Sequence, residues 1–121
     1  MTEDGDARDL KRVADMLSWA EQALSHAEDL DEGRFRASRL HQGAITHCLT
    51  IVGEAASRTS PGFRARNAHI PWTVIVGMRN KLIHDCGGVA LKVVWVTVTE
   101  DVPDLVAQLR AILPPGETLP P

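Results

Sequence analysis

The sequence contains no tyrosine, only two cysteines and no long run of apolar residues. Two cysteines, Cys48 and Cys86, are too few for a disulfide framework and are typical of a protein in a reducing compartment. Without an apolar run of about 18 residues, no membrane-spanning helix is expected. Residues 1–6 are acidic and lack the apolar segment of an export signal. We therefore expect a cytoplasmic protein that does not enter a membrane.

The length and composition are those of one folded domain. The chain has 121 residues, of which 44% are hydrophobic and 24% are charged. A chain of this size buries about two-thirds of its unfolded surface, so a core can form without disulfides or metal. We predict a single helical domain over residues 1–113, followed by a flexible, proline-rich tail over residues 114–121.

Acidic and basic residues are segregated along the chain. Residues 1–33 carry three Lys/Arg against ten Asp/Glu, residues 34–92 carry nine against two, and residues 93–121 carry one against four. The middle segment therefore has a net charge of +7, although the whole chain has −3. Such a segment could present a positive face to a polyanion, or it could complement acidic helices within a bundle.

Apolar residues recur at spacings of three and four through most of the chain, which predicts helices. The clearest stripe runs from Leu10 to Ala27, in a helix that Asp6 caps and Gly33 ends. Further helices are predicted over residues 34–57, 71–85 and 102–113, and a loop over residues 59–69. The predicted fold is an all-α antiparallel bundle of four to five helices.

One segment fits two patterns. Residues 93–99 have the β-branched content of a strand, whereas Leu91, Val94, Trp95 and Val98 follow helical spacing. No other segment is predicted to be a strand that could pair with this one. We therefore predict a helix here.

The predicted helix over residues 71–85 has an apolar face and a polar face. The apolar face carries Trp72, Ile75, Arg79, Leu82 and Cys86, and the polar face carries Thr73, Gly77, Asn80, Lys81 and His84. An unpaired charge within an apolar face is costly, so Arg79 requires a partner or a polar cavity. A glycine at position 77 would let another backbone or a substrate approach closely.

Arg79 and His84 suit the cleavage of RNA. A histidine with a pKa near neutrality can take a proton from a 2′-hydroxyl or return one to the leaving oxygen. A guanidinium can stabilise the negative charge of the transition state. The two positions lie about 140° apart around a helix, so both can border one groove. From spacing alone, a structural role for Arg79 in an ion pair remains the alternative.

The residues around this pair resemble the HepT-like toxins of the HEPN superfamily, whose signature is Arg-x4-His, usually followed by x-Tyr. The resemblance covers most of the chain and is densest between residues 51 and 109. It is carried by Ile51-Val52-Gly53-Glu54-Ala55-Ala56, Ile70-Pro71-Trp72, Gly77-Met78-Arg79-Asn80, Leu82-Ile83-His84-Asp85, Val94-Trp95 and Thr99-Glu100-Asp101.

The resemblance implies a HEPN-like bundle that forms a homodimer, in which an Arg/His pair from each subunit meets at a shared groove. It implies a metal-independent endoribonuclease toxin of a type II/VII-like toxin–antitoxin pair, with no cofactor. The products would carry a 2′,3′-cyclic phosphate and a 5′-hydroxyl, and the partner would be a nucleotidyltransferase antitoxin of the MntA type. Arg79 and His84 match the catalytic pair, and Asn80 matches the polar residue that usually follows the arginine.

Cys86 occupies the position at which the family commonly has tyrosine. In such systems that tyrosine is the residue to which the antitoxin attaches AMP. A thiol is a poor substitute, and the chain has no tyrosine elsewhere. Another means of silencing, such as tight binding of the antitoxin or a different modification site, would be required.

Other polar residues could support this site. Glu54 could pair with Arg58 four residues later on its own helix, or it could position Arg79. Basic side chains that could contact RNA phosphates are Lys81, Arg58, Arg64 and Arg66, although a solvated basic loop is the ordinary explanation for the last three. No metal site is predicted, because His47, Cys48, His84 and Cys86 fit no zinc-binding spacing.

A second kind of function is compatible with the same residues. The departure at Cys86 and the negative net charge also fit a non-catalytic subunit of a nucleotidyltransferase complex, which binds a nucleotide or a partner in the same groove. Substitution of His84 distinguishes the two, because only a nuclease depends on its imidazole.

Overall fold

The computed structural model describes residues 3–84 and 89–114, and every regular element within them is helical. The elements are α1 (Glu3–Ala27), α2 (Glu32–Ala37), α3 (Arg39–Ser57), α4 (Pro61–Arg66), α5 (Trp72–His84), α6 (Val89–Val96), the π-helical turn η1 (Thr97–Asp101) and α7 (Val102–Ile112). The prediction of an all-α bundle is confirmed. Apart from Pro114, the predicted tail lies outside the described residues.

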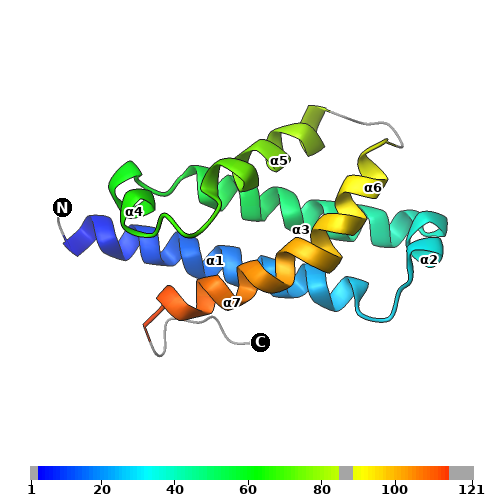
Figure 1. Ribbon diagram of the computed structural model, residues 1–121, viewed down its shortest axis with the longest axis horizontal. Helices are drawn as coiled ribbons and strands as arrows, with labels where there is room; N and C mark the ends of the chain where they lie inside the picture. Colours follow the sequence, from blue (N-terminus) through cyan, green and yellow to red (C-terminus); the bar gives the residue numbers. More distant parts are fainter. Residues whose placement is uncertain (1–2, 85–88, 115–121) are drawn as a thin grey trace.

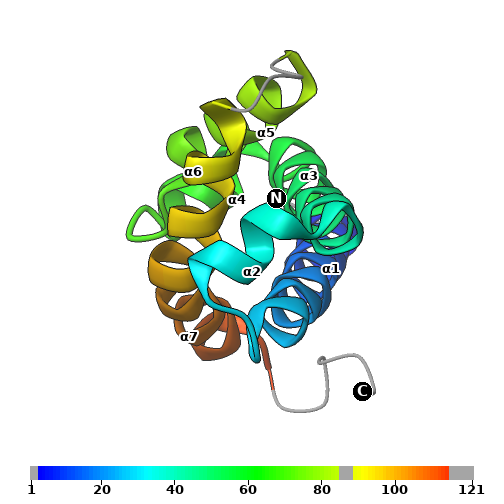
Figure 2. The same ribbon diagram turned by 90° about the vertical axis from the view of Figure 1, so that its right-hand side faces the viewer.

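The chain runs along the bundle four times, as α1, α3, α5 and the α6–α7 segment, and each pass is antiparallel to the one before it (Figure 1). The helices α1 and α3 lie side by side, α5 packs on α3, and α7 packs on α1. The fourth pass runs from α6 through η1 into α7 as one continuous helical segment. Viewed from the end, the short α2 lies across the bundle, between α3 and the fourth pass (Figure 2).

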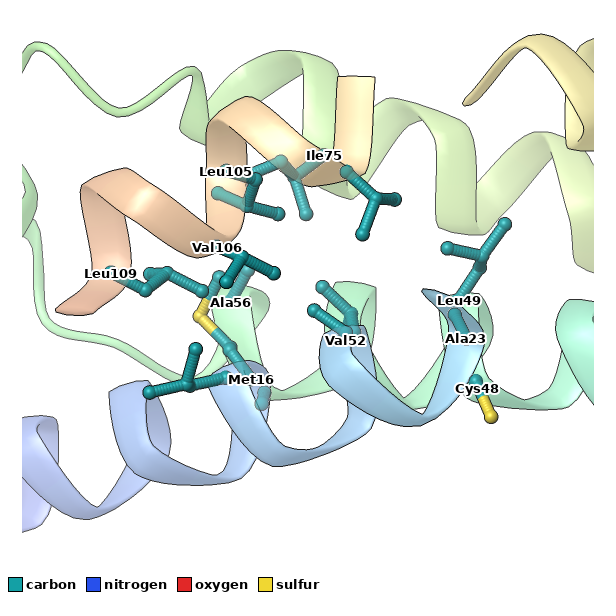
Figure 3. Packing of buried hydrophobic residues seen from close by; sticks show 14 of the residues in the cluster. Met16, Ala23, Cys48, Leu49, Val52, Ala56, Ile75, Leu105, Val106 and Leu109 are labelled. Carbon is teal, nitrogen blue, oxygen red and sulfur yellow. The ribbon is translucent and has the colours of Figure 1, made fainter. Parts of the chain in front are cut away.

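The core fills the space between these four passes. Met16 and Ala23 from α1, Cys48, Leu49, Val52 and Ala56 from α3, Ile75 from α5, and Leu105, Val106 and Leu109 from α7 pack together there (Figure 3). This arrangement follows from the apolar stripe of each helix, since each stripe must face a partner. Cys48 is 2% exposed, and burial raises the pKa of its thiol, which is typical of an unreactive structural cysteine.

The predicted helix over residues 34–57 is wrong at its start. Asp31 accepts a hydrogen bond from the backbone N–H of Arg34 (2.8 Å) and caps α2, so Gly33 lies inside a helix and does not end one. Ser38 has an extended backbone and accepts from the N–H of His41 (3.2 Å), which starts α3 anew. Caps at Asp31 and Ser38 therefore make two helices, α2 and α3, of a segment that apolar spacing predicts as one.

The predicted loop over residues 59–69 contains the short helix α4. Ser60 caps it by accepting a hydrogen bond from the N–H of Phe63, and Pro61 occupies its first turn. The Phe63 ring contacts Trp72 edge-on, with ring centroids 6.2 Å apart. These contacts fix the approach of the chain to α5.

Residues 93–99 are helical, as predicted from their spacing, but they continue into α7 without the expected break. The N–H of Val102 bonds to the carbonyl of Thr97, five residues earlier, and this π turn joins α6 to α7. The Trp95 ring of α6 stacks on the Phe35 ring of α2, with ring centroids 5.3 Å apart. None of the described helices combines the length and apolar character needed to cross a bilayer.

A buried carboxylate joins α1 to the start of α4. Asp9 is 4% exposed, and its two oxygens accept hydrogen bonds from the N–H (2.8 Å) and the hydroxyl (2.7 Å) of Ser60. Bonds to a charged group are worth about 1.5–3 kcal/mol, and an unsatisfied buried donor is costly.

We expect Asp9→Ala to lower the free energy of unfolding by about 1–3 kcal/mol. Urea denaturation monitored by circular dichroism measures this change. Asp15→Ala is the matched control, because Asp15 is on the same helix and makes no hydrogen bond or ion pair within residues 3–84 and 89–114. Equal effects of the two substitutions would contradict a structural role for the Asp9–Ser60 contact.

Candidate active site

The helices α3 and α5 are in close contact at Gly53 and Arg79. Gly53 is buried, and a Cβ built on it would overlap Cβ of Arg79 and lie 2.8 Å from its Cγ. The carbonyl oxygen of Ile75 would be 3.3 Å away. The stem of Arg79 therefore lies directly against the backbone of α3.

Arg79 occupies the apolar face of α5 but extends to the surface. On that face Trp72, Ile75 and Leu82 are buried, as their spacing predicts, whereas the Arg79 side chain is 31% exposed. Its stem is covered and its charged end is partly hydrated, an arrangement that long basic side chains commonly adopt. The Nε atom is buried and has no hydrogen-bond partner among the described residues.

Two side chains hold the guanidinium. Nη1 donates to Oδ1 of Asn80 (2.8 Å), and Nη2 lies 3.4 Å from Oε1 of Glu54 on α3. Of the two partners that the sequence allowed for Glu54, the structure pairs it with Arg79, and no Glu54–Arg58 ion pair forms among the described residues. The Glu54 side chain is 41% exposed, so this pair orients Arg79 and adds little stability.

His84 is the last residue of α5. The backbone of His84 lies one helical turn after that of Asn80, so the two positions share the polar face of α5. Its side chain and all of Cys86 lie outside the described residues. Among the described side chains, the candidate site therefore consists of Arg79, Asn80 and Glu54.

The four candidate phosphate contacts fall into two groups. Arg64 donates to the carbonyls of Ala56 (3.0 Å) and Ser57 (2.9 Å) and so closes the C-terminus of α3. Arg66 binds Asp6 (2.9 Å) on α1. Arg58 and Lys81 are exposed. Arg64 and Arg66 thus have structural partners within the subunit, and Lys81 is the exposed cation nearest in sequence to Arg79.

A cleft of about 880 Å³ opens between α5 and the η1–α7 segment. Its walls are mostly apolar and include Val74, Met78, Val93 and Leu105, with Val74 68% exposed. Lys81 lies on one side, and Asp101 and Asp104 lie on the other. Gly77 also lines this cleft, and a Cβ there would meet nothing within 4 Å, so the close approach expected at Gly77 does not occur within the described chain.

The described residues do not gather three His, Cys, Asp or Glu side chains into a group that could hold a metal ion. His47 contacts Trp19 edge-on at 5.5 Å, and its neighbour Cys48 is in the core. These two residues therefore have packing roles.

Comparisons with known proteins point to one family. Residues 10–112 match the family described as "Ribonuclease HepT-like". "Putative RNase MJ0125" from Methanocaldococcus jannaschii is 31% identical over 107 residues, which cover 88% of this chain and 92% of that protein. "Probable ribonuclease HepT" from Thermococcus cleftensis is 39% identical over 71 residues, which cover 59% of this chain and 64% of that protein. No solved structure matches the chain.

Proposed function

The chain belongs to the HepT-like ribonuclease family, and on that premise we propose that it is a metal-independent endoribonuclease acting through Arg79 and His84. The observation that carries this proposal is the arrangement of Arg79. Its guanidinium reaches the surface from an apolar helix face and is oriented by Glu54 and Asn80. A guanidinium held in this way can receive a phosphate without first reorganising.

In the proposed reaction, the imidazole of His84 takes the proton of a ribose 2′-hydroxyl, and the 2′-oxygen attacks the adjacent phosphorus. The bond between phosphorus and the 5′-oxygen breaks, and an imidazolium returns a proton to that oxygen. Arg79 stabilises the negative charge that accumulates on the phosphoryl oxygens. The products are a 2′,3′-cyclic phosphate and a 5′-hydroxyl.

The active form in this proposal is a homodimer in which the Arg79–His84 pairs of two subunits border one groove. Supply of a second imidazole by the neighbouring subunit would provide both the base and the acid of the reaction. The exposed Lys81 and Arg58 would bind RNA phosphates beside it. The basic character of residues 34–92 supports an anionic substrate.

We further propose that this ribonuclease is the toxin of a toxin–antitoxin pair, with a nucleotidyltransferase of the MntA type as its partner. Because the chain has no tyrosine, attachment of AMP to a tyrosine cannot silence it. Tight binding of the partner over the active groove would silence it instead.

Cleavage of a defined RNA oligomer tests the proposal. We expect the purified protein to give fragments with 2′,3′-cyclic phosphate and 5′-hydroxyl ends, because the 2′-oxygen is the nucleophile. The rate should be unchanged in excess EDTA, and mass spectrometry of the fragments identifies the ends. An oligomer with a single 2′-deoxy residue at the cleaved position is the control and should stay intact. Strict dependence on a divalent cation, or 5′-phosphate ends, would contradict the mechanism.

A non-catalytic binding subunit is the second candidate. The cleft between α5 and the η1–α7 segment favours it, since an apolar cleft of this size can hold a partner or a small molecule without any cleavage. Expression of the gene alone in a bacterium separates the candidates. Growth arrest that His84→Ala relieves supports the nuclease, and unimpaired growth with either protein supports the binding subunit.

A further inference from the structure

The helices α3 and α5 touch at Gly53. A Cβ at this position would overlap Cβ of Arg79, and its distance of 2.8 Å from Cγ is shorter than real contacts between such atoms. These atoms form the root of the Arg79 side chain, so rotation of the side chain cannot clear Cβ. Relief would require α5 to move away from α3.

Three other helical glycines, Gly33, Gly43 and Gly77, do not have this contact. A Cβ on Gly43, in the same helix, or on Gly77 would meet nothing within 4 Å, and one on Gly33 would be 3.4 Å from Oδ1 of Asp31. A glycine in a helix interior costs about 1 kcal/mol relative to alanine. At Gly53 the close approach of Arg79 offsets that cost.

The same turn of α3 also supplies the partner of the guanidinium. Gly53 contacts the stem of Arg79, and the next residue, Glu54, lies 3.4 Å from its Nη2. Nε remains buried without a partner among the described residues, which costs free energy. The packing at Gly53 acts on the stem of Arg79, while Glu54 acts on its charged end.

We propose that Gly53 is a positioning residue for the reaction: the missing side chain at position 53 sets how far the Arg79 guanidinium projects and keeps it beside Glu54. This inference rests on the proposed role of Arg79 in RNA cleavage. A displacement of about 1 Å in a catalytic group can lower a rate by about 10²-fold. A methyl group at position 53 should therefore act on catalysis and not only on packing.

Gly53→Ala should lower kcat for RNA cleavage by about 10–100-fold and leave KM within about twofold, because the phosphate still binds but the charge is displaced. Gly43→Ala, the same change on the same helix, should leave kcat unchanged. Single-turnover kinetics measured well below each melting temperature separates this effect from loss of folded protein. Gly53→Ala should have little further effect in an Arg79→Gly background, because that change removes both the guanidinium and the Cβ that the new methyl group would meet.

Glu54→Gln provides a second variant should Gly53→Ala not fold. Its carboxylate is partly exposed, so the amide should fold normally, and kcat should fall by about 3–10-fold only when Arg79 is present. Equal losses with and without Arg79, or a Gly53→Ala enzyme as active as wild type, would overturn the positioning role. Full activity of Arg79→Ala would instead overturn the proposed function itself.

Discussion

Replacement of His84 by alanine is expected to lower the rate of RNA cleavage by about 10²–10⁴-fold, the usual contribution of a general acid or base. Without the imidazole, the 2′-hydroxyl must lose its proton to water, and the 2′-oxygen is a much weaker nucleophile. The fold should persist, because His84 is the last residue of α5 and the buried anchors Trp72, Ile75 and Leu82 precede it. Single-turnover cleavage of a labelled oligomer measures the rate, and thermal melting by circular dichroism measures the fold.

His69→Ala is the matched control for this substitution. His69 is exposed and precedes α5, so its loss removes an imidazole without touching the proposed site. We expect it to cleave at the wild-type rate. If His84→Ala also cleaves at that rate while remaining folded, the imidazole of His84 is not the acid or base, and the assignment of the site is wrong.

The sequence predicts the long helices well because their apolar residues recur over several turns. The stripe from Leu10 to Ala27 lies in α1, and the apolar face of α5 packs as its spacing indicates. Residues 93–99 are the instructive case: their β-branched content favours a strand, yet the bundle offers no strand partner and helical spacing prevails.

The features that sequence reasoning missed depend on single side chains. The helix α4 is six residues long, too short to show periodicity, and Ser60-Pro61 can begin either a helix or a turn. The break at Ser38 is another case, since a capping serine outweighs an apolar pattern that runs through it. In both cases one hydrogen bond, donated by a backbone N–H to a serine hydroxyl oxygen, marks the start of the helix.

The candidate site was predictable in part. An arginine within an apolar face predicts a partner, and the structure supplies Glu54. The close contact between Gly53 and Arg79 was missed, although a glycine in the interior of an apolar helix commonly marks such a contact. Its partner could not be found from sequence, because the pairing of Gly53 with Arg79 depends on how α5 lies on α3.

Replacement of Arg79 by alanine is expected to lower the rate of RNA cleavage by about 10²–10³-fold. Removal of one hydrogen-bond donor that stabilises transition-state charge has an effect of this size in other enzymes. Arg79→Lys should recover only a small part of this rate. An ammonium lacks the planar fork that allows Arg79 to contact Asn80, Glu54 and a phosphate in fixed directions. The same single-turnover assay measures both variants, with the binding of uncleaved 2′-deoxy oligomer measured in parallel.

Removal of an arginine elsewhere should not have this effect, and Arg110→Ala provides the control. Arg110 on α7 also pairs with a glutamate, Glu21, at 2.9 Å, but it is 60% exposed and remote in sequence from α5. Loss of an exposed pair costs about 1 kcal/mol or less of stability, so neither variant should unfold. Because Glu54 is 41% exposed, water can solvate its carboxylate once Arg79 is gone. A folded Arg79→Ala protein that cleaves RNA as fast as Arg110→Ala would therefore mean that Arg79 serves only as an ion-pair partner.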